Sequence, residues 1–169
     1  MPRRARSGDS SGLSNMPTLR PSRPQDGARV IDIWRRAVDA THHFLAAADR
    51  QAIEAEVRAF LPQAPLLLAV DVDDVPLAFM LVMDGHMEAL FVDPAHHGRG
   101  LGRRLVAHAL GEHPQLGTDV NAQNPQAMAF YARLGFVETG RSPLDGQGRP
   151  YPLVHLRHAG VPCVSEEAR

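Results

Sequence analysis

One stretch of the sequence, VDPAHHGRGLGRRL, limits the possible folds more than any other. It joins an apolar run that predicts a strand over 86–92 to an apolar stripe that predicts a helix over 100–113. Gly98, Gly100 and Gly102 stand at alternate positions between these two elements. Glycines that lead into a helix leave several backbone N–H groups unpaired, at the end where the helix dipole is positive. The stretch therefore predicts a loop that binds an anion such as a phosphate group.

Three interpretations of this loop compete. A Walker-type loop must end in Gly-Lys-Ser/Thr, and the chain contains no lysine. A dinucleotide-binding fingerprint needs the spacing G-x-G-x-x-G, but the sixth residue counted from Gly98 is Arg103. Asp119 stands about 20 residues on, where that fingerprint has its ribose ligand, so a small Rossmann-like module remains an alternative. A nest of amides for a diphosphate, with Arg99, Arg103 and Arg104 at its rim, fits best; a flexible loop before a solvated basic helix is the plain alternative.

The apolar pattern predicts an α/β (mixed α+β) fold with the order β-α-α-β-β-β-α-β-α-β-β, in which a mixed sheet of six to seven strands has helices on both faces. Asp84-Gly85 predicts a hairpin between two of the strands. A helix separates the strands at 86–92 and 116–122, so these two are expected to be parallel. The expected strands are 17–20, 65–72, 75–83, 86–92, 116–122, 136–142 and 151–157.

The helices have recognisable ends. Ser22 is expected to cap the first helix, with Pro24 in its first turn. The last helix is short, with Asn124 as its N-cap and Gly135 just past its end. The second helix is expected to pack through Ile53, Val57, Phe60 and Leu61.

Length and composition exclude several classes of protein. The 169 residues suit one domain, expected at 16–158, between a disordered extension at 1–15 and a loose tail at 159–169. Met16 is a candidate natural start. A net charge of −1 and 5% aromatic residues disfavour nucleic acid as a partner, and no apolar run is long enough to span a membrane. A single cysteine favours a cytoplasmic location.

A second motif, NAQNPQAMAFYARLGF, follows one strand after the glycine loop. The two together resemble the two signatures of the GNAT superfamily of acyl-CoA-dependent N-acyltransferases. The first signature is Val-x-Pro followed by Q/R-x-x-G-x-G/A; here it reads Val92 to Pro94 and then HGRGLG, with His97 where the family usually has Gln or Arg. The resemblance covers about residues 16 to 157 and is closer to the YjaB-type branch of small bacterial members. It implies the GNAT fold, an acyltransferase activity and acetyl-CoA as cosubstrate.

The resemblance also implies a set of residues that bind acetyl-CoA. In the family, the strand before the loop splays from its parallel neighbour, and the pantetheine arm bonds to its backbone. The loop amides hold the pyrophosphate, and an asparagine helps to hold the arm. Carried over, the cofactor-binding residues are Leu90, Phe91, Val92, His97, Gly98, Arg99, Gly100, Leu101, Gly102, Arg103 and Asn124.

Acylation of an amine needs a base for the amine and an acid for the leaving thiolate. Tyr131 matches the family tyrosine that protonates the coenzyme A sulfur, although it also shares an apolar helical face and therefore suits a core position. For the base, Glu88 is expected first, with His86 and Asp119 next, or a chain of water molecules. Alternation along a strand is expected to put His86, Glu88, Leu90 and Val92 on one face. An ordinary paired charge is the plain interpretation of Glu88.

The acceptor site of this fold lies between the first two helices and the last hairpin, so Trp34, His42 and Tyr151 are candidate substrate-binding residues. The acceptor is an amine, of a small molecule or a protein, and the enzyme is expected to be a monomer or homodimer. No metal site is expected, because the nine histidines form no HExxH or Cys/His cluster. A non-catalytic domain that binds or senses acyl-CoA is the leading alternative function.

Overall fold

The computed structural model describes residues 16–160. The seven strands are β1 (Thr18–Pro21), β2 (Leu67–Val70), β3 (Pro76–Met83), β4 (His86–Val92), β5 (Gly117–Asn121), β6 (Phe136–Ser142) and β7 (Leu153–His158). The four α-helices are α1 (Gly27–Thr41), α2 (Ala47–Phe60), α3 (Leu101–Glu112) and α4 (Pro125–Arg133). Short 3-10 turns are η1 (Pro24–Asp26), η2 (Leu61–Gln63) and η3 (Pro94–His96). No helix within this part of the chain is long and apolar enough to cross a membrane.

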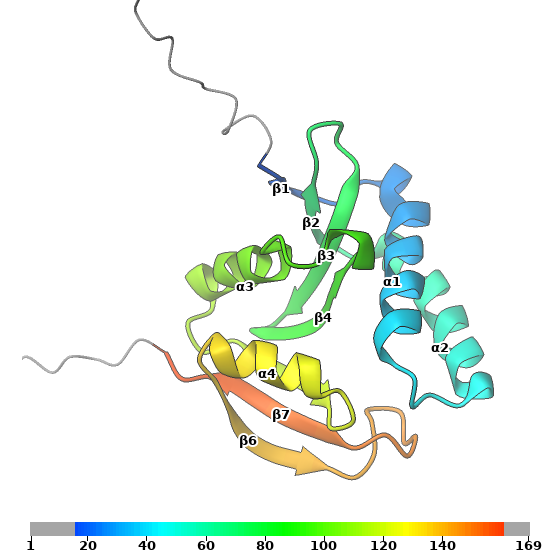
Figure 1. The fold of residues 1–169 in the computed structure, drawn as a ribbon, viewed down its shortest axis with the longest axis vertical. Helices are drawn as coiled ribbons and strands as arrows, with labels where there is room; N and C mark the ends of the chain where they lie inside the picture. Colours follow the sequence, from blue (N-terminus) through cyan, green and yellow to red (C-terminus); the bar gives the residue numbers. More distant parts are fainter. Residues whose placement is uncertain (1–15, 161–169) are drawn as a thin grey trace, which may run out of the picture.

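The strands form one sheet in the order β1-β2-β3-β4-β5-β7-β6. Helices α1 and α2 cover one face and α3 and α4 the other (Figure 1). The predicted element order and the predicted mixed sheet are confirmed. Within residues 16–160 the only parallel pair is β4 with β5, so the topology is not that of a Rossmann-like module, which needs consecutive parallel strands.

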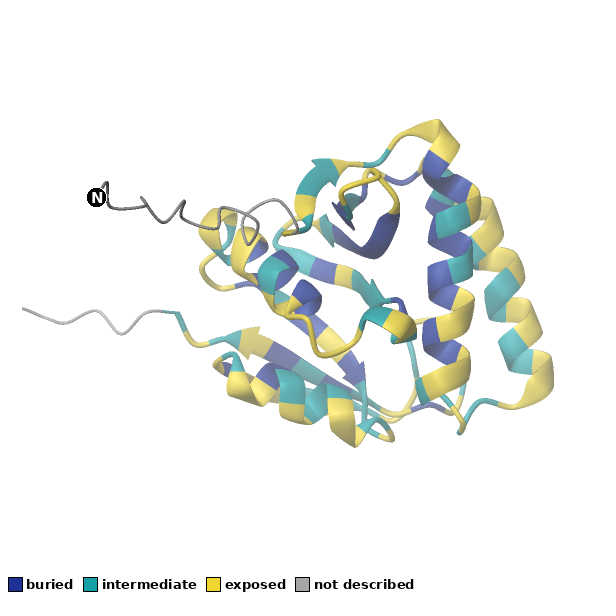
Figure 2. Cartoon of the chain, turned by 45° about the horizontal axis from the view of Figure 1, so that its top comes forward, coloured by how far each residue is buried: buried dark blue, intermediate teal, exposed yellow. Residues whose placement is uncertain are grey.

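Two clusters of buried apolar side chains lie on opposite faces of the sheet because successive strand residues point to opposite sides. Along β3, Phe79 and Leu81 pack under α1, whereas Ala78 and Met80 pack under α3. The inner side of α1 is buried along its length, whereas α2 has no fully buried residue (Figure 2). Helix α1 is therefore held firmly against the sheet, and α2 is an outer helix.

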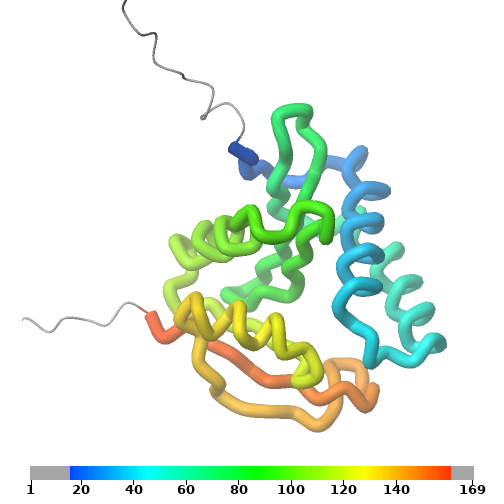
Figure 3. Tube along the Cα trace, in the orientation of Figure 1, coloured from blue at the N-terminus to red at the C-terminus, as the bar shows by residue number. Residues whose placement is uncertain are grey.

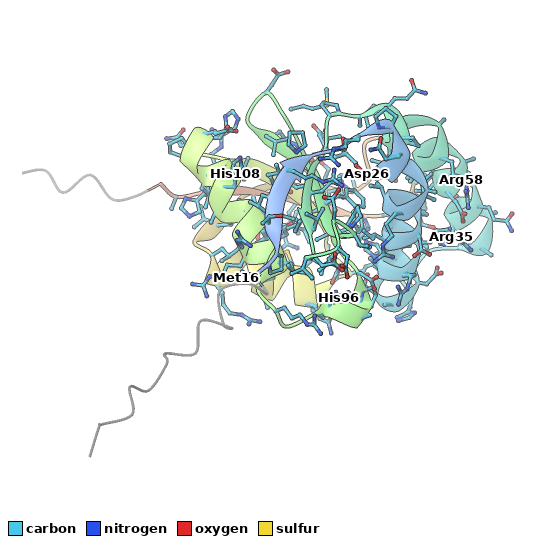
Figure 4. All side chains as sticks on the ribbon, turned by 90° about the horizontal axis from the view of Figure 1, so that it is seen from above. Met16, Asp26, Arg35, Arg58, His96 and His108 are labelled. Atoms are coloured by element: carbon cyan, nitrogen blue, oxygen red, sulfur yellow. The ribbon has the colours of Figure 1, made fainter. Side chains whose placement is uncertain are left out.

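Two local predictions are wrong. Ser22 does not cap the first helix; its hydroxyl donates to the carbonyl of Ala64 and accepts from the N–H of Leu66. The carboxylate of Asp26, labelled in Figure 4, accepts from the N–H of Arg23 instead and closes the turn before α1. Phe60 does not pack inward either, because it ends α2 with 52% of its surface exposed.

The strand β4 contains a bulge at Glu88. Val82 of β3 pairs with Met87, and the preceding residue of β3, Leu81, pairs with Ala89. Glu88 between them is therefore the extra residue. A bulge reverses the alternation of side chains along a strand. Met87 consequently packs in the same cluster as Leu90 and Val92, and the prediction that His86, Glu88, Leu90 and Val92 share one face is wrong.

Strands β4 and β5 separate soon after they meet. Only His86 with Gly117 and Met87 with Thr118 are paired, although β4 runs on to Val92. In Figure 3 this junction joins the N-terminal half of the trace, blue to green, to the C-terminal half, yellow to red. The separation opens the sheet in the middle, at the place where the glycine loop begins.

Candidate functional site

A cleft of about 450 Å³ follows the opening between β4 and β5. Its walls come from the end of α1, the outer half of β4, the loop into α3, and α4. In Figure 1, α1 and α4 stand on either side of this opening. Segments distant in the sequence therefore meet along one surface.

The glycine loop forms one end of the cleft. Gly98 and Gly100 have φ angles of 77° and 74°, a left-handed conformation that glycine adopts without strain. The first hydrogen bond of α3 runs from the N–H of Arg104 to the carbonyl of Gly100. The N–H groups of residues 101–103 therefore have no partner within the helix. A Cβ on Gly102 would lie 3.3 Å from the ring of Phe130. This close approach brings the positive end of α3 against α4.

Asp93 fixes the start of the loop. Its side chain is 1% exposed, and its Oδ2 accepts from Arg29 at 2.6 Å and from Arg36 at 2.8 Å. Its Oδ1 accepts from the N–H of Ala95. Burial pushes the pKa of Asp93 up, but the hydrogen bonds from Arg29 and Ala95 and the charges of both arginines pull it further down, so that its pKa lies below the usual value. Asp93 thus joins α1 to the loop as a buried carboxylate.

Tyr131 lies on the cleft wall and is 8% exposed. Its ring packs edge-on against Phe130 and Phe136. Burial raises the pKa of Tyr131, and Thr118 lies beside its hydroxyl. The hydroxyl of Thr118 donates to the carbonyl of Met87 at the last paired position of β4 and β5. The Tyr131 hydroxyl is therefore protonated and near the point where the two strands part.

The cleft brings together most of the residues predicted from sequence. Asn124 caps α4 by accepting from the N–H of Ala127, which leaves its side-chain N–H groups to donate elsewhere. The predicted residues that line the cleft are His42, Leu90, Phe91, Val92, His97, Gly98, Gly100, Leu101, Gly102, Arg103, Asn124 and Tyr131. Arg99 is exposed and does not line it.

The three expected base residues form a separate polar cluster that does not line the cleft. His86 bonds through Nδ1 to Glu88 at 3.1 Å and approaches Asp119 at 3.5 Å. Asp119 also bonds to Nδ1 of His155, whose Nε2 bonds to the hydroxyl of Ser142. Within residues 16–160 no three His, Cys, Asp or Glu side chains are arranged to hold a metal ion.

The other two candidate acceptor residues also lie off the cleft wall. Trp34 is 4% exposed in the core on the α1 side, with the guanidinium of Arg50 over its ring. Tyr151 is buried before β7, where its hydroxyl donates to Asp49 and accepts from the N–H of Ala46 at the start of α2. Tyr151 therefore ties the β6–β7 loop to α2.

Sequence reasoning missed six residues of the cleft, which are Ala37, Thr41, His96, Gln126, Ala127 and Phe130. His96, labelled in Figure 4, lies on η3, and its Nδ1 is buried without a hydrogen-bond partner among the described residues. The doublet His96-His97 was visible in the sequence, but nothing in the pattern showed that the first imidazole turns inward.

These features fit a thioester cofactor that carries a diphosphate. The loop supplies free amides at a helix N-terminus, and Arg103 adds a positive charge. His96 also lines the cleft, and its buried Nδ1 has no hydrogen-bond partner among the described residues. The outer half of β4 is paired with β3 but not with β5, so its edge on the β5 side offers backbone groups to an extended amide-containing arm.

Comparisons with known proteins agree with this geometry. Residues 30–149 match the model of the acetyltransferase (GNAT) domain. The chain is 51% identical to peptidyl-lysine N-acetyltransferase YjaB of Escherichia coli K12 over 85% of this chain and 98% of that protein. The solution structure of apo-form YjaB from Escherichia coli has a TM-score of 0.82 at 50% identity, covering 86% of this chain and 99% of YjaB. The structure of Salmonella typhimurium yncA with its cofactor acetyl-CoA has a TM-score of 0.56 at 25% identity, over 85% and 93% of the two chains.

Proposed function

The chain belongs to the GNAT family and is an acetyl-CoA-dependent N-acetyltransferase, and from this premise we propose that its acceptor is the side-chain amine of lysine in proteins. Two relatives that cover most of the chain, at 51% and 52% identity, are named for peptidyl-lysine. The observation that supports acetyl transfer at this site is one cleft, in which the glycine loop and Tyr131 line the same surface.

In this proposal acetyl-CoA supplies the acetyl thioester, and the residues of the cleft hold it. The amides of residues 97–103 bind its diphosphate, with Arg103 adding charge. The backbone of 90–92 and the side-chain amide of Asn124 hold the pantetheine arm. The Tyr131 hydroxyl donates its proton to the sulfur as the thiol leaves, which its raised pKa permits because it stays protonated at neutral pH.

A second hollow continues the cleft on the side of the acceptor. It shares Thr41, Asn124 and Gln126 with the cleft and extends to His43 and Phe44. A lysine side chain reaching in through this hollow passes between α1 and α4 towards Tyr131. The hollow is open to solvent. It therefore suits a lysine within a polypeptide, because the chain on both sides of that lysine needs room outside the cleft.

The proposal predicts a ranking of acceptors. With acetyl-CoA, the purified protein is expected to acetylate an N-terminally blocked lysine peptide with a kcat/KM at least about tenfold higher than for two other acceptors. The first is a peptide whose only amine is its N-terminus, and the second is a polyamine. Mass spectrometry of each product checks this. A preference for the N-terminal amine or the polyamine would refute lysine as acceptor while leaving the acetyltransferase activity intact.

A further inference from the structure

The cleft contains histidines but no carboxylate among the described residues that line it. A group that accepts a proton from an amine inside the cleft must therefore be an imidazole or water. Three histidines line the cleft: His42 at the end of α1, and His96 and His97 at the loop. Only His42 stands on the wall formed by α1, where the second hollow with its candidate acceptor path begins.

The hydrogen bonds of His42 fix its tautomer. The Thr41 hydroxyl donates its one hydrogen to the carbonyl of Ala37 at 2.8 Å. The same oxygen lies 2.7 Å from Nδ1 of His42, so it accepts the hydrogen that Nδ1 donates. The other nitrogen, Nε2, consequently keeps a lone pair. No hydrogen bond to Nε2 occurs within the described residues, so the lone pair is available to a substrate.

The surroundings of His42 keep the imidazole neutral. Burial lowers its pKa, and the electrostatic influence of the neighbouring His43 lowers it further. The rings of Phe44 and Phe91 pack beside it, with centroids at 5.3 Å and 6.5 Å. The remaining titratable groups on the cleft walls are His96, His97 and Arg103 from the loop and Tyr131 from α4, and none of these carries a negative charge at neutral pH.

The residues that the sequence indicated as general bases are placed less well for that role than His42. The Glu88 and Asp119 side chains are 48% and 35% exposed, and both already bond to histidines of the polar cluster outside the cleft. His97 is exposed at the end of η3, within the anion-binding loop. Of these groups, His42 alone combines a position on the cleft wall with a fixed, unshared acceptor nitrogen.

We propose that Nε2 of His42 is the general base that takes the proton from the amine acceptor, an assignment that rests on the proposed N-acetyl transfer. As the bond from the amine nitrogen to the acetyl carbon forms and the carbon–sulfur bond breaks, His42 receives one proton from the nitrogen. Tyr131 gives its proton to the sulfur. The proton on His42 then returns to Tyr131 through water, so that the amine and the thioester become an amide and a thiol with no net change of protons.

The test uses three variants of the full-length protein and an amine that the wild type acetylates. His42→Gln is expected to lower kcat at neutral pH by about tenfold or more, to leave the Kd for acetyl-CoA unchanged, and to flatten the rise of kcat/KM with pH. His108→Gln, on the exposed face of α3 (Figure 4), is the matched control and is expected to behave as the wild type. Glu88→Gln is expected to keep the pH profile of the wild type.

Three results would overturn the assignment. The first is a His42→Gln variant with the wild-type kcat and pH profile. The second is a Glu88→Gln variant that loses the rise of kcat/KM with pH. The third is an NMR spectrum of the imidazole nitrogens that places the hydrogen of neutral His42 on Nε2. The NMR measurement needs no turnover and therefore tests His42 independently of the proposed function. A wild-type protein that acetylates other amines but not lysine would refute only the proposed acceptor.

Discussion

Replacing Tyr131 with phenylalanine is expected to lower kcat by about 1,000-fold, because the leaving thiolate then finds no proton donor at the inner end of the cleft. The substitution removes one oxygen and keeps the ring that packs against Phe130 and Phe136. The Kd for acetyl-CoA, measured by calorimetry, is expected to change less than about twofold. Steady-state release of the thiol checks the kcat.

Folding must be controlled in this experiment, since Tyr131 is also a core residue. Loss of the buried Tyr131 hydroxyl is expected to cost about 1 kcal/mol of unfolding free energy, which leaves the variant folded. A Tyr131→Phe variant that turns over at the wild-type rate would show that water protonates the thiolate.

The second large effect concerns Asp93. Asp93→Ala is expected to lower the free energy of unfolding by about 2–3 kcal/mol, because Arg29, Arg36 and the N–H of Ala95 lose the buried carboxylate that accepts hydrogen bonds from all three. The matched control is Asp32→Ala, which removes the exposed carboxylate on the same Arg29 and is expected to cost less than about 1 kcal/mol. Urea denaturation measures both. Similar losses in the two variants would contradict the account of Asp93.

The same carboxylate gives stability a defined pH dependence. Because the folded-state pKa of Asp93 is below the ordinary value of 3.8, its contribution is fully present above that value and is lost as pH falls through the folded-state pKa. The wild type is therefore expected to lose stability below about pH 4 more steeply than Asp93→Ala. If the free energies of unfolding of the two proteins fall in parallel below about pH 4, Asp93 is not held ionised in the folded protein.

Most of the fold follows from local sequence signals. The hairpin of β3 and β4 turns at Asp84-Gly85, whose φ angles of 51° and 74° are those that such a dipeptide favours. Asn124 caps α4 as expected, and Gly135, at φ 92°, follows its end. The residues on the loop side of the cleft were predictable for the same reason, since a loop and a helix cap are encoded by neighbouring residues.

The proposed acceptor side depends on contacts that no local pattern encodes. The bulge at Glu88 follows from the register of β4 against β3, and it turns the expected base away from the face predicted for it. The tautomer of His42 depends on Thr41 and Ala37 one helical turn earlier. Asp93 reads as a loop residue in sequence, but it pairs with arginines 57 and 64 positions away.

The central claim is that the opening between β4 and β5 and the glycine loop together bind acetyl-CoA. Backbone amide NMR tests it most directly, because the claim concerns the amides themselves. On titration with acetyl-CoA, the largest chemical-shift changes are expected at residues 97–103 and 90–92, with smaller ones around Tyr131. Changes confined to the polar cluster of His86 and Asp119, with the loop amides unmoved, would contradict the account.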